Sequence, residues 1–285
     1  MQPGAFAVSY TGTPPNTAPA NTKPVDPVDK TDTNSPAAPT RGGTRSAPLA
    51  ERPDSSTHTR SPKNPVHPKA TQLRTGYVTH RTEYRGLNFL QGNLARSQVS
   101  THEASMLATD LHIDIMLLQE PYAVSNIPVR FNLTHKIISA NGPDAYPWAA
   151  IIIINPDLRV TNIRQAGNEY LTLAHIASDN SDLYVASIYM KYSEDPGIIL
   201  DVLGKAIRMI GGASIIIAAD TNAASITWGA EQTNPRGEIV EEFANIHGLK
   251  VINGPDQPPT FATNRAQGYL DVTGAKGRIA RAITN

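Results

Sequence analysis

The sequence has no cysteine among its 285 residues. Disulfide bonds, thiolate zinc sites and thiol-based catalysis are therefore excluded within this chain. Its apolar runs are much shorter than the roughly 18 residues that a membrane-spanning helix needs. Residues 1–10 also lack the charged region followed by an apolar stretch that marks a secretory signal. We therefore expect a soluble, intracellular protein.

Large apolar residues are scarce in the first 80 residues, where proline is concentrated. Of the 23 prolines, 13 lie between Pro3 and Pro68. A segment of this composition buries too little apolar surface to offset the entropy that it would lose on ordering. We predict a disordered tail rich in Pro, Ser and Thr over residues 1–80, followed by a folded domain over residues 81–285.

The formal net charge of zero conceals a small imbalance between these two parts. The tail has 9 Lys/Arg against 5 Asp/Glu, whereas the remainder has 16 against 20. The basic residues of the tail are scattered and form no dense block of the kind that binds nucleic acid. A solvated linker is therefore favoured over a phosphate-binding arm, and the role of the tail stays open.

The folded part begins with a strand, a helix and a second strand. Residues 86–91 alternate in polarity as a strand does, and Gly92-Asn93 is expected to end it. The Ser-x-x-Glu spacing of Ser100 and Glu103 matches a capping box, which predicts a helix of about three turns. The apolar residues 113–119 then form the second strand.

The rest of the sequence alternates between strand patterns and a few helical ones. Gly248 follows a helical pattern that Asn234-Pro235 introduces, so residues 236–247 are expected to be helical. A further helix is predicted at 197–210, and strands at 136–139, 149–154, 171–177, 183–189, 215–220, 249–252 and 269–272. This mixture predicts an α/β fold, a four-layer sandwich of two packed mixed sheets flanked by helices.

Polar residues of one chemical type occur near the ends of these strands. Asn93, Glu120, the Asp220/Asn222 pair and Asp271 all carry oxygen donors. Asp220 and Asn222 are two residues apart, so on an extended chain they would point the same way. Without cysteine or clustered histidine, such oxygens suit Mg²⁺, or Mn²⁺, better than zinc. Taken singly, each residue is more often found in a turn or a cap.

The order and spacing of several short motifs resemble a known family. The sequence is similar to the endonuclease domain of non-LTR (LINE-type) retrotransposons, particularly the R1-like branch, within the endonuclease/exonuclease/phosphatase superfamily. The resemblance covers about residues 86–285. It rests on Asn93 with Arg96-Ser97, on Leu117-Leu118-Gln119-Glu120-Pro121-Tyr122, on Ala219-Asp220-Thr221-Asn222-Ala223 with Trp228-Gly229, on Arg236-Gly237-Glu238 and on Asp271-Val272-Thr273.

The resemblance implies a role for each matching residue. Glu120 corresponds to the metal-binding glutamate, and Asn93 to the asparagine that helps to arrange the metal and the phosphate. Tyr189 corresponds to the tyrosine that hydrogen-bonds the scissile phosphate. Asp220 corresponds to the aspartate that positions or deprotonates the attacking water, and Asn222 lies beside it on the phosphate.

The resemblance also implies that Asp271 orients a catalytic histidine. In the family that histidine lies in a Ser-Asp-His string beyond the Asp271 position, and no such string precedes Asn285. We therefore expect a C-terminally truncated copy, without its last strand or strands and weakly active or inactive. Trp228 is expected to pack in the core rather than to face DNA, whereas Tyr122 and Tyr192 are candidate groove residues.

The function that the resemblance implies is Mg-dependent hydrolysis of a DNA phosphodiester. The nick would supply a 3′-hydroxyl that primes reverse transcription, so the partners would be target DNA and, in the full-length parent, the element RNA and a reverse transcriptase domain. Nuclear localisation follows from that substrate. Two alternatives stay open: a phosphatase or phosphodiesterase of the same superfamily, and a non-catalytic remnant that binds nucleic acid.

Overall fold

A computed structural model describes residues 78–82, 86–139, 145–177, 182–255, 257–262 and 267–284. Residues 1–77, which include nearly all of the predicted tail, lie outside these ranges. Within them, no helix is long and apolar enough to cross a bilayer.

Within the described residues, the first of two large sheets has six strands in the order β16-β1-β2-β3-β7-β6. Its strands β2 and β3 are parallel, and the other neighbouring pairs are antiparallel. The bounds are Ile283–Thr284 (β16), Val78–Thr82 (β1), Asn88–Asn93 (β2), Ile115–Gln119 (β3), Ala149–Ile153 (β7) and Lys136–Ile138 (β6).

The second large sheet, within the same ranges, also has six strands, in the order β12-β15-β11-β10-β9-β8. Strands β10 and β11 are its parallel pair. The bounds are Lys250–Val251 (β12), Asp271–Lys276 (β15), Ser214–Asp220 (β11), Leu183–Tyr189 (β10), Leu171–Ala177 (β9) and Arg159–Asn162 (β8). Two short ribbons pair β4 (Ala123–Val124) with β5 (Ile127–Pro128), and β13 (Phe261–Ala262) with β14 (Gln267–Gly268).

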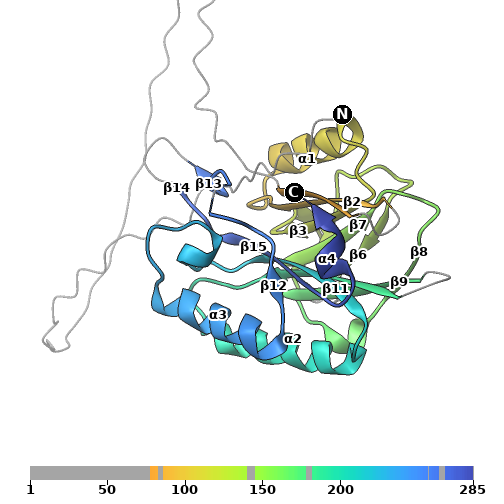
Figure 1. Cartoon of the computed structure of the whole chain (residues 1–285). Helices are drawn as coiled ribbons and strands as arrows, with labels where there is room; N and C mark the ends of the chain where they lie inside the picture. Colours follow the sequence, from red (N-terminus) through yellow and green to blue (C-terminus); the bar gives the residue numbers. More distant parts are fainter. Residues whose placement is uncertain are drawn as a thin grey trace, which may run out of the picture. The chain divides into compact units, whose positions relative to one another are not determined.

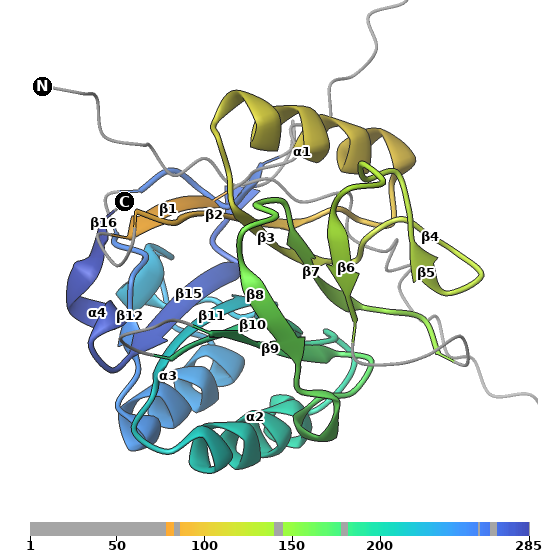
Figure 2. The same cartoon turned by 90° about the vertical axis from the view of Figure 1, so that its right-hand side faces the viewer.

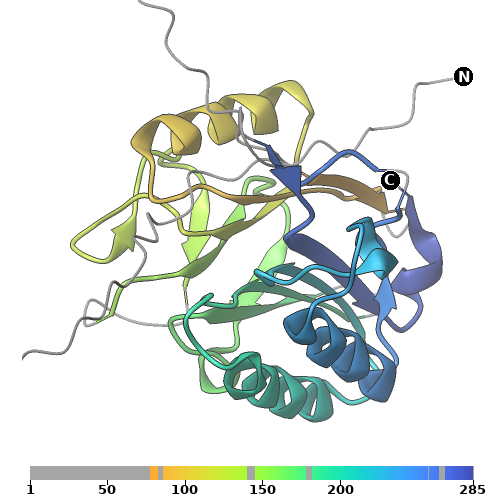
Figure 3. The same ribbon diagram turned by 90° about the vertical axis from the view of Figure 1, so that its left-hand side faces the viewer.

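Helices cover the outer faces of the two sheets. Helix α1 (Gln98–Asp110) lies over the first sheet, and α2 (Pro196–Ile210) and α3 (Pro235–His247) lie side by side over the second (Figures 1, 2 and 3). The short α4 (Ile279–Ala282) and the 3-10 turns η1 (Arg164–Ala166) and η2 (Ile226–Trp228) complete the helical elements of the described ranges. The predicted four-layer α/β sandwich is confirmed.

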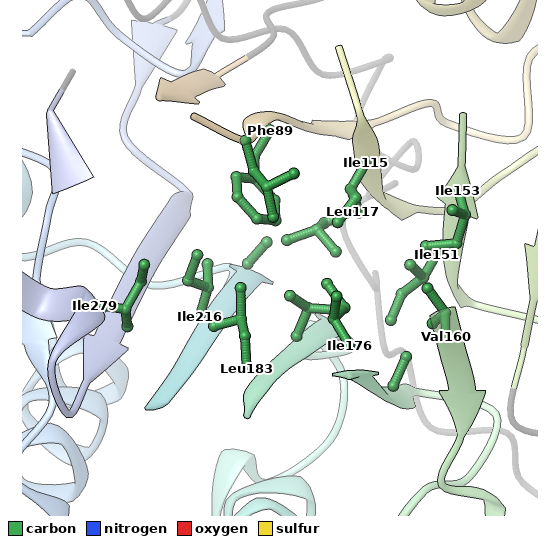
Figure 4. Packing of buried hydrophobic residues seen from close by; sticks show 14 of the residues in the cluster. Phe89, Ile115, Leu117, Ile151, Ile153, Val160, Ile176, Leu183, Ile216 and Ile279 are labelled. Carbon is green, nitrogen blue, oxygen red and sulfur yellow. The ribbon is translucent and has the colours of Figure 1, made fainter. Parts of the chain in front are cut away.

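Three clusters of buried apolar side chains separate these layers within the described residues. The cluster between the sheets includes Phe89, Leu117 and Ile216 (Figure 4). Alternate residues of the same strands face outward, so Ile215 and Ile217 pack in the cluster that includes residues of α2 and α3. This explains why β11 is continuously apolar, since both of its faces are buried.

Several element boundaries differ from the predictions. The folded part begins earlier than residue 81, because β1 starts at Val78 and pairs with β2 along its length. Gly92-Asn93 does not end the strand, since pairing on both sides by β1 and β3 carries β2 through to Asn93. The N-cap of helix α1 is Ser97, three residues before the predicted cap Ser100, and Ser97 Oγ accepts from Ser100 N at 3.2 Å.

At the C-terminal side, the strand predicted at 269–272 begins only at Asp271 and continues to Lys276. Strands β9 and β10 match their predicted bounds. Helix α3 begins one residue before its predicted start and ends where predicted, with Asn234 capping its start and Gly248 in the left-handed conformation at its end. Strand β16 forms the edge of the first sheet beside β1.

Candidate active site

Polar side chains from both sheets meet where the central parallel strands end. In the first sheet, Asn93 at the end of β2 is level with Gln119, and Glu120 follows directly. In the second sheet, Tyr189 at the end of β10 is level with Asp220 at the end of β11. The sandwich therefore brings its strand ends to one edge, where side chains distant in sequence come into contact.

A single amide nitrogen joins the two sheets at this edge. Asn93 Nδ2 donates to Glu120 Oε1 at 3.0 Å and to Asp220 Oδ2 at 2.7 Å. The orientation of the amide is fixed, because Asn93 Oδ1 accepts from the backbone nitrogen of Ala95 at 2.7 Å. Two carboxylates are thus held against one donor at the centre of the candidate site.

The backbone around Glu120 adopts a conformation that L-residues seldom take. Ala95, Arg96 and Glu120 have φ values of 48°, 56° and 45°, and Arg96 N donates to Glu120 O at 2.7 Å. Arg96 Nε lies 3.2 Å from Glu120 Oε2, and its side chain is 56% exposed. Such left-handed residues concentrate at functional sites, where the surrounding fold holds them in place. The loop after β2 therefore fixes Glu120 and presents Arg96 at the rim of the site.

Asp220 is almost fully buried at the end of β11. Burial raises the pKa of its carboxyl group to about 7, and the nearby negative charge of Glu120 adds to the increase. Hydrogen bonds from Asn93 and from the backbone nitrogen of Asn222 oppose it, as does the positive charge of Arg236. A carboxylate with a pKa near neutrality can accept a proton at physiological pH.

Asn222 lies near Asp220, but not by the geometry that the sequence suggested. Strand β11 ends at Asp220, and Asn222 has φ of 48°, so the alternation of an extended strand does not apply. Its backbone nitrogen donates to Asp220 Oδ1 at 3.1 Å, and its Nδ2 donates to Met190 O at 3.1 Å. In this structure the side-chain amide of Asn222 links the ends of β10 and β11.

Tyr189 belongs to a group of aromatic rings beside the two carboxylates. Its ring stacks on Trp148 with centroids 5.3 Å apart and planes at 10°, and Tyr170 lies 6.4 Å away. Burial and the negative charges of Glu120 and Asp220 raise the pKa of the Tyr189 hydroxyl. The hydroxyl therefore stays protonated at neutral pH and can serve as a hydrogen-bond donor.

Asp271 is also at this edge, at the start of β15. It is buried and lies opposite Asp220 in the antiparallel pairing of β11 with β15. Its backbone nitrogen donates to Thr260 Oγ1 at 3.0 Å, and its carbonyl oxygen accepts from Asn253 Nδ2 at 3.3 Å. The sequence-predicted residues on β11 and β15 are thus adjacent.

Two of the histidines contact residues other than Glu120, Asp220 and Asp271. His175 on β9 lies 2.8 Å from Asp182, and His247 at the end of α3 packs against Phe243. Within the described ranges, no group of three or more His, Cys, Asp or Glu side chains is arranged to hold a metal ion.

The structure also shows residues that the sequence did not reveal. Gln119 Nε2 donates to Ser187 Oγ at 2.9 Å, and Thr273 Oγ1 donates to Gln91 Oε1 at 2.7 Å, both between the sheets. Gln119 and Gln91 also donate to backbone carbonyls of β11. These buried polar contacts tie the two sheets together just behind the candidate site.

Arg236 has a structural role that sequence analysis missed. Its guanidinium donates to the carbonyl oxygens of Thr221 and Glu194 at 2.8 Å, and of Met190 and Lys191 at 3.1 Å. These carbonyls lie in the segments that follow β10 and β11. Arg236 therefore fixes the backbone on either side of the strand ends that carry the site.

The three aromatic residues that the sequence singled out differ in their burial. Trp228 is buried, as expected, and its Nε1 donates to Ala223 O at 3.3 Å and Tyr269 O at 3.1 Å. Tyr192 is 69% exposed, and Tyr122 is partly buried. Their roles as groove residues stay predictions.

The two-sheet sandwich with carboxylates at its strand ends agrees with the endonuclease/exonuclease/phosphatase fold that the sequence motifs indicated. An endonuclease-reverse transcriptase family model matches residues 183–285. The Pol polyprotein of the type-1 retrotransposable element R1 of Bradysia coprophila is 26% identical over 159 residues, which are 53% of this chain and 15% of that protein. The chain thus spans a small part of its curated relative.

A solved structure gives the same assignment. The endonuclease domain of TRAS1, a telomere-specific non-LTR retrotransposon, is 26% identical with a TM-score of 0.60, over 66% of this chain and 84% of that chain. The catalytic domain of Xenopus laevis APE2 is more remote, at 10% identity and a TM-score of 0.49, over 68% of this chain and 83% of that chain. The resemblance that the sequence motifs indicated is confirmed: this chain is a homologue of non-LTR retrotransposon endonuclease domains.

Proposed function

We propose that this domain nicks DNA by Mg-dependent hydrolysis of a phosphodiester. The observation that carries the proposal is the Asn93 amide, which holds Glu120 from one sheet and Asp220 from the other. Two carboxylates in contact with one donor at a sheet edge form a site where a cation, a water molecule and a phosphate can meet. The homology to retrotransposon endonuclease domains supports DNA as the substrate.

Glu120 is the residue that would hold the cation. Its carboxylate is near the surface, with 13% of the side chain exposed, and its partners include the cationic Arg96. An oxygen site with one or two carboxylates suits Mg²⁺, which retains several waters. When bound, such an ion would offset charge on the phosphoryl group and on the departing oxygen. Asn93 was predicted as a second ligand, but its nitrogen faces the carboxylates, so we assign it to positioning them.

Asp220 and Tyr189 supply the proton chemistry in this proposal. Asp220 has a pKa of about 7, so its carboxylate can take a proton from the attacking water at neutral or higher pH. The protonated hydroxyl of Tyr189 can donate to a non-bridging phosphate oxygen. Asn222 would contribute through its link between the ends of β10 and β11 and through its proximity to Asp220.

Asp271 would orient a histidine that follows it in related endonucleases. We propose that a histidine supplied in a Ser-Asp-His string beyond Asp271 raises the rate of DNA cleavage, because Asp271 would then have a partner to orient. In a longer parent, the nick would provide the 3′-hydroxyl for a reverse transcriptase domain acting on element RNA. The corresponding site of action would be the nucleus.

Cleavage of supercoiled plasmid tests the proposal. The assay compares this chain with a version extended through a Ser-Asp-His strand, each with Mg²⁺ and with EDTA. We expect Mg-dependent nicked circles from the extended protein, and a loss on the order of 100-fold with Glu120→Gln. Asp201→Asn, an exposed acid on α2, is the matched control and should not change the rate.

Two results would contradict the proposal. A folded extended protein that hydrolyses inositol phosphates and leaves plasmid intact would indicate a phosphatase. A folded extended protein that cleaves neither substrate would indicate a non-catalytic remnant.

A further inference from the structure

A pocket of about 200 Å³ opens beside the candidate site, and its chemistry differs from that of the site. Tyr189 belongs to both, since it lines the pocket and is level with Asp220 on the neighbouring strand. Arg236 lines the pocket as well, and it also binds Thr221 O next to Asp220. A nucleic acid whose phosphate lies at the carboxylates therefore has an adjacent nucleotide within reach of the pocket.

Aromatic rings form one wall of this pocket. Tyr170 and Tyr189 both line it, with their planes at 26° to each other. Trp148, which does not line the pocket, stacks on Tyr189 at 5.3 Å and on Tyr170 at 6.0 Å and so helps to hold both tyrosine rings in place. Ile198 and Ile199 at the start of α2 add apolar surface. A flat, preorganised aromatic wall is suited to stacking with a planar ring.

The charges of the pocket argue against a phosphate. Glu169, Glu194 and Asp195 contribute three carboxylates to its lining. Lys191 is paired with Glu194 at 2.8 Å, Asp195 Oδ1 accepts from Gly197 N at 2.8 Å at the start of α2, and the guanidinium of Arg236 donates to backbone carbonyls. The three carboxylates and two cations leave a formal charge of −1 on the lining. The net negative lining repels phosphate, whereas carboxylate oxygens accept hydrogen bonds from exocyclic amino groups.

We propose that this pocket binds an unpaired nucleobase next to the scissile phosphate and favours bases that have an exocyclic amino group. The inference rests on the proposed function for its choice of DNA as the ligand. In a paired duplex the faces of a base are covered by its neighbours, so the base must be single-stranded or turned out of the stack to enter. The pocket thus makes local unpairing at the cleavage step part of substrate recognition.

Equilibrium binding of short single strands tests the pocket without cleavage. The probes are fluorescein-labelled dC8 and dU8, two pyrimidine oligonucleotides of equal length and charge, and dT8 is run beside them to measure the effect of the 5-methyl group. Cytosine has an amino group at C4 where uracil and thymine have a carbonyl. Fluorescence anisotropy is measured in EDTA, so that no hydrolysis occurs. We expect dC8 to bind about tenfold more tightly than dU8, in line with the discrimination that one well-placed amino contact gives.

Variants locate the effect. Tyr170→Ala should weaken dC8 binding about tenfold through lost stacking, whereas Tyr170→Phe keeps the ring and should stay within about twofold of the unmodified protein. Tyr184→Ala is the matched control, because Tyr184 lies at the other end of β10, against His175. Glu169→Gln should reduce the preference for dC8 over dU8, since an amide can also donate to uracil.

The outcomes separate this inference from the proposed function. Two results would overturn the proposed base-binding role of the pocket even if plasmid is nicked. The first is equal affinity for the oligonucleotides with and without the amino group. The second is unchanged dC8 binding by a Tyr170→Ala protein that has an unaltered thermal melt. Tyr170-dependent binding of dC8 in a protein whose extended form never nicks DNA would support the pocket and overturn the nuclease proposal.

Discussion

Replacement of Arg236 by alanine tests whether the site depends on a backbone clamp. The side chain makes hydrogen bonds to four carbonyl oxygens in the segments after β10 and β11. Two of them keep another partner in the variant, because Met190 O also accepts from Asn222 Nδ2 and Lys191 O from Glu194 N. The carbonyls of Thr221 and Glu194 lose the contact that Arg236 provides.

The expected cost follows from these contacts. A hydrogen bond to a charged group contributes about 1.5–3 kcal/mol, and water can reach part of a half-buried clamp. All four bonds are lost in Arg236→Ala, but two of the carbonyls keep another partner, so we predict that the free energy of unfolding falls by about 3 kcal/mol. Arg236→Lys should lose about half as much, since an ammonium cannot reach all of the carbonyls.

Urea denaturation followed by circular dichroism measures this change. Arg208→Ala is the control, since Arg208 is exposed on α2, and its replacement should change stability by less than about 0.5 kcal/mol. An Arg236→Ala protein as stable as the Arg208→Ala protein would refute the clamp. Under conditions where Arg236→Ala is still folded, DNA nicking by the extended protein should fall further than stability explains, because Asp220 and Asn222 flank Thr221.

The buried core strands could be predicted from the sequence because burial of a strand requires apolar residues along its length. Strand β11 is buried on both faces, so an unbroken run of Ile and Ala was sufficient to identify it. Predictions were less accurate where pairing between strands determines the outcome. Gly92 carries a weak strand preference, yet β1 and β3 on either side keep it in β2. No local pattern contains that information.

The candidate site was predictable as a set of residues but not as an arrangement. Glu120 and Asp220 come at the ends of largely apolar runs, and Asn93 follows a strand of alternating polarity, so each position has a visible signal. In the structure one amide nitrogen binds both carboxylates. This contact depends on how the two sheets pack, and the spacing of residues in the sequence does not reveal it. Arg236 was visible as part of a motif, but its four contacts with backbone carbonyls were not, since an arginine near a helix start is most often a surface residue.

The grouping of the three aromatic residues could have been predicted from their sequence positions together with the strand order. Trp148 directly precedes β7, Tyr170 directly precedes β9, and Tyr189 ends β10. Strand β7 is antiparallel to β3, and β9 is antiparallel to β10, so all of these positions fall at the edge where β3 and β10 end. Aromatic residues next to strand ends on one edge can therefore be grouped once the strand order is known.

Three further predictions concern the site and its support. Arg96→Gln should tighten Mn²⁺ binding several-fold in isothermal titration calorimetry, because it removes a cation from Glu120; unchanged affinity would contradict this. Gly237→Ala should destabilise the protein by about 2 kcal/mol or more in urea denaturation, since its Cβ would lie 2.0 Å from Ala224 O. A variant as stable as the unmodified protein would contradict this close contact between the two backbone segments. The third concerns pH. Because folding raises the pKa of Asp220 from 3.8 to about 7, its contribution to stability is fully present below pH 3.8 and is lost as pH rises through 7. Between pH 5 and pH 8 this loss amounts to about 3 kcal/mol in EDTA. Asp220→Asn cannot ionise, so its unfolding free energy relative to the unmodified protein should rise by about that amount over the same interval. Urea denaturation at both pH values measures the difference, and parallel pH dependence of the two proteins would show that the buried carboxyl is not the titrating group.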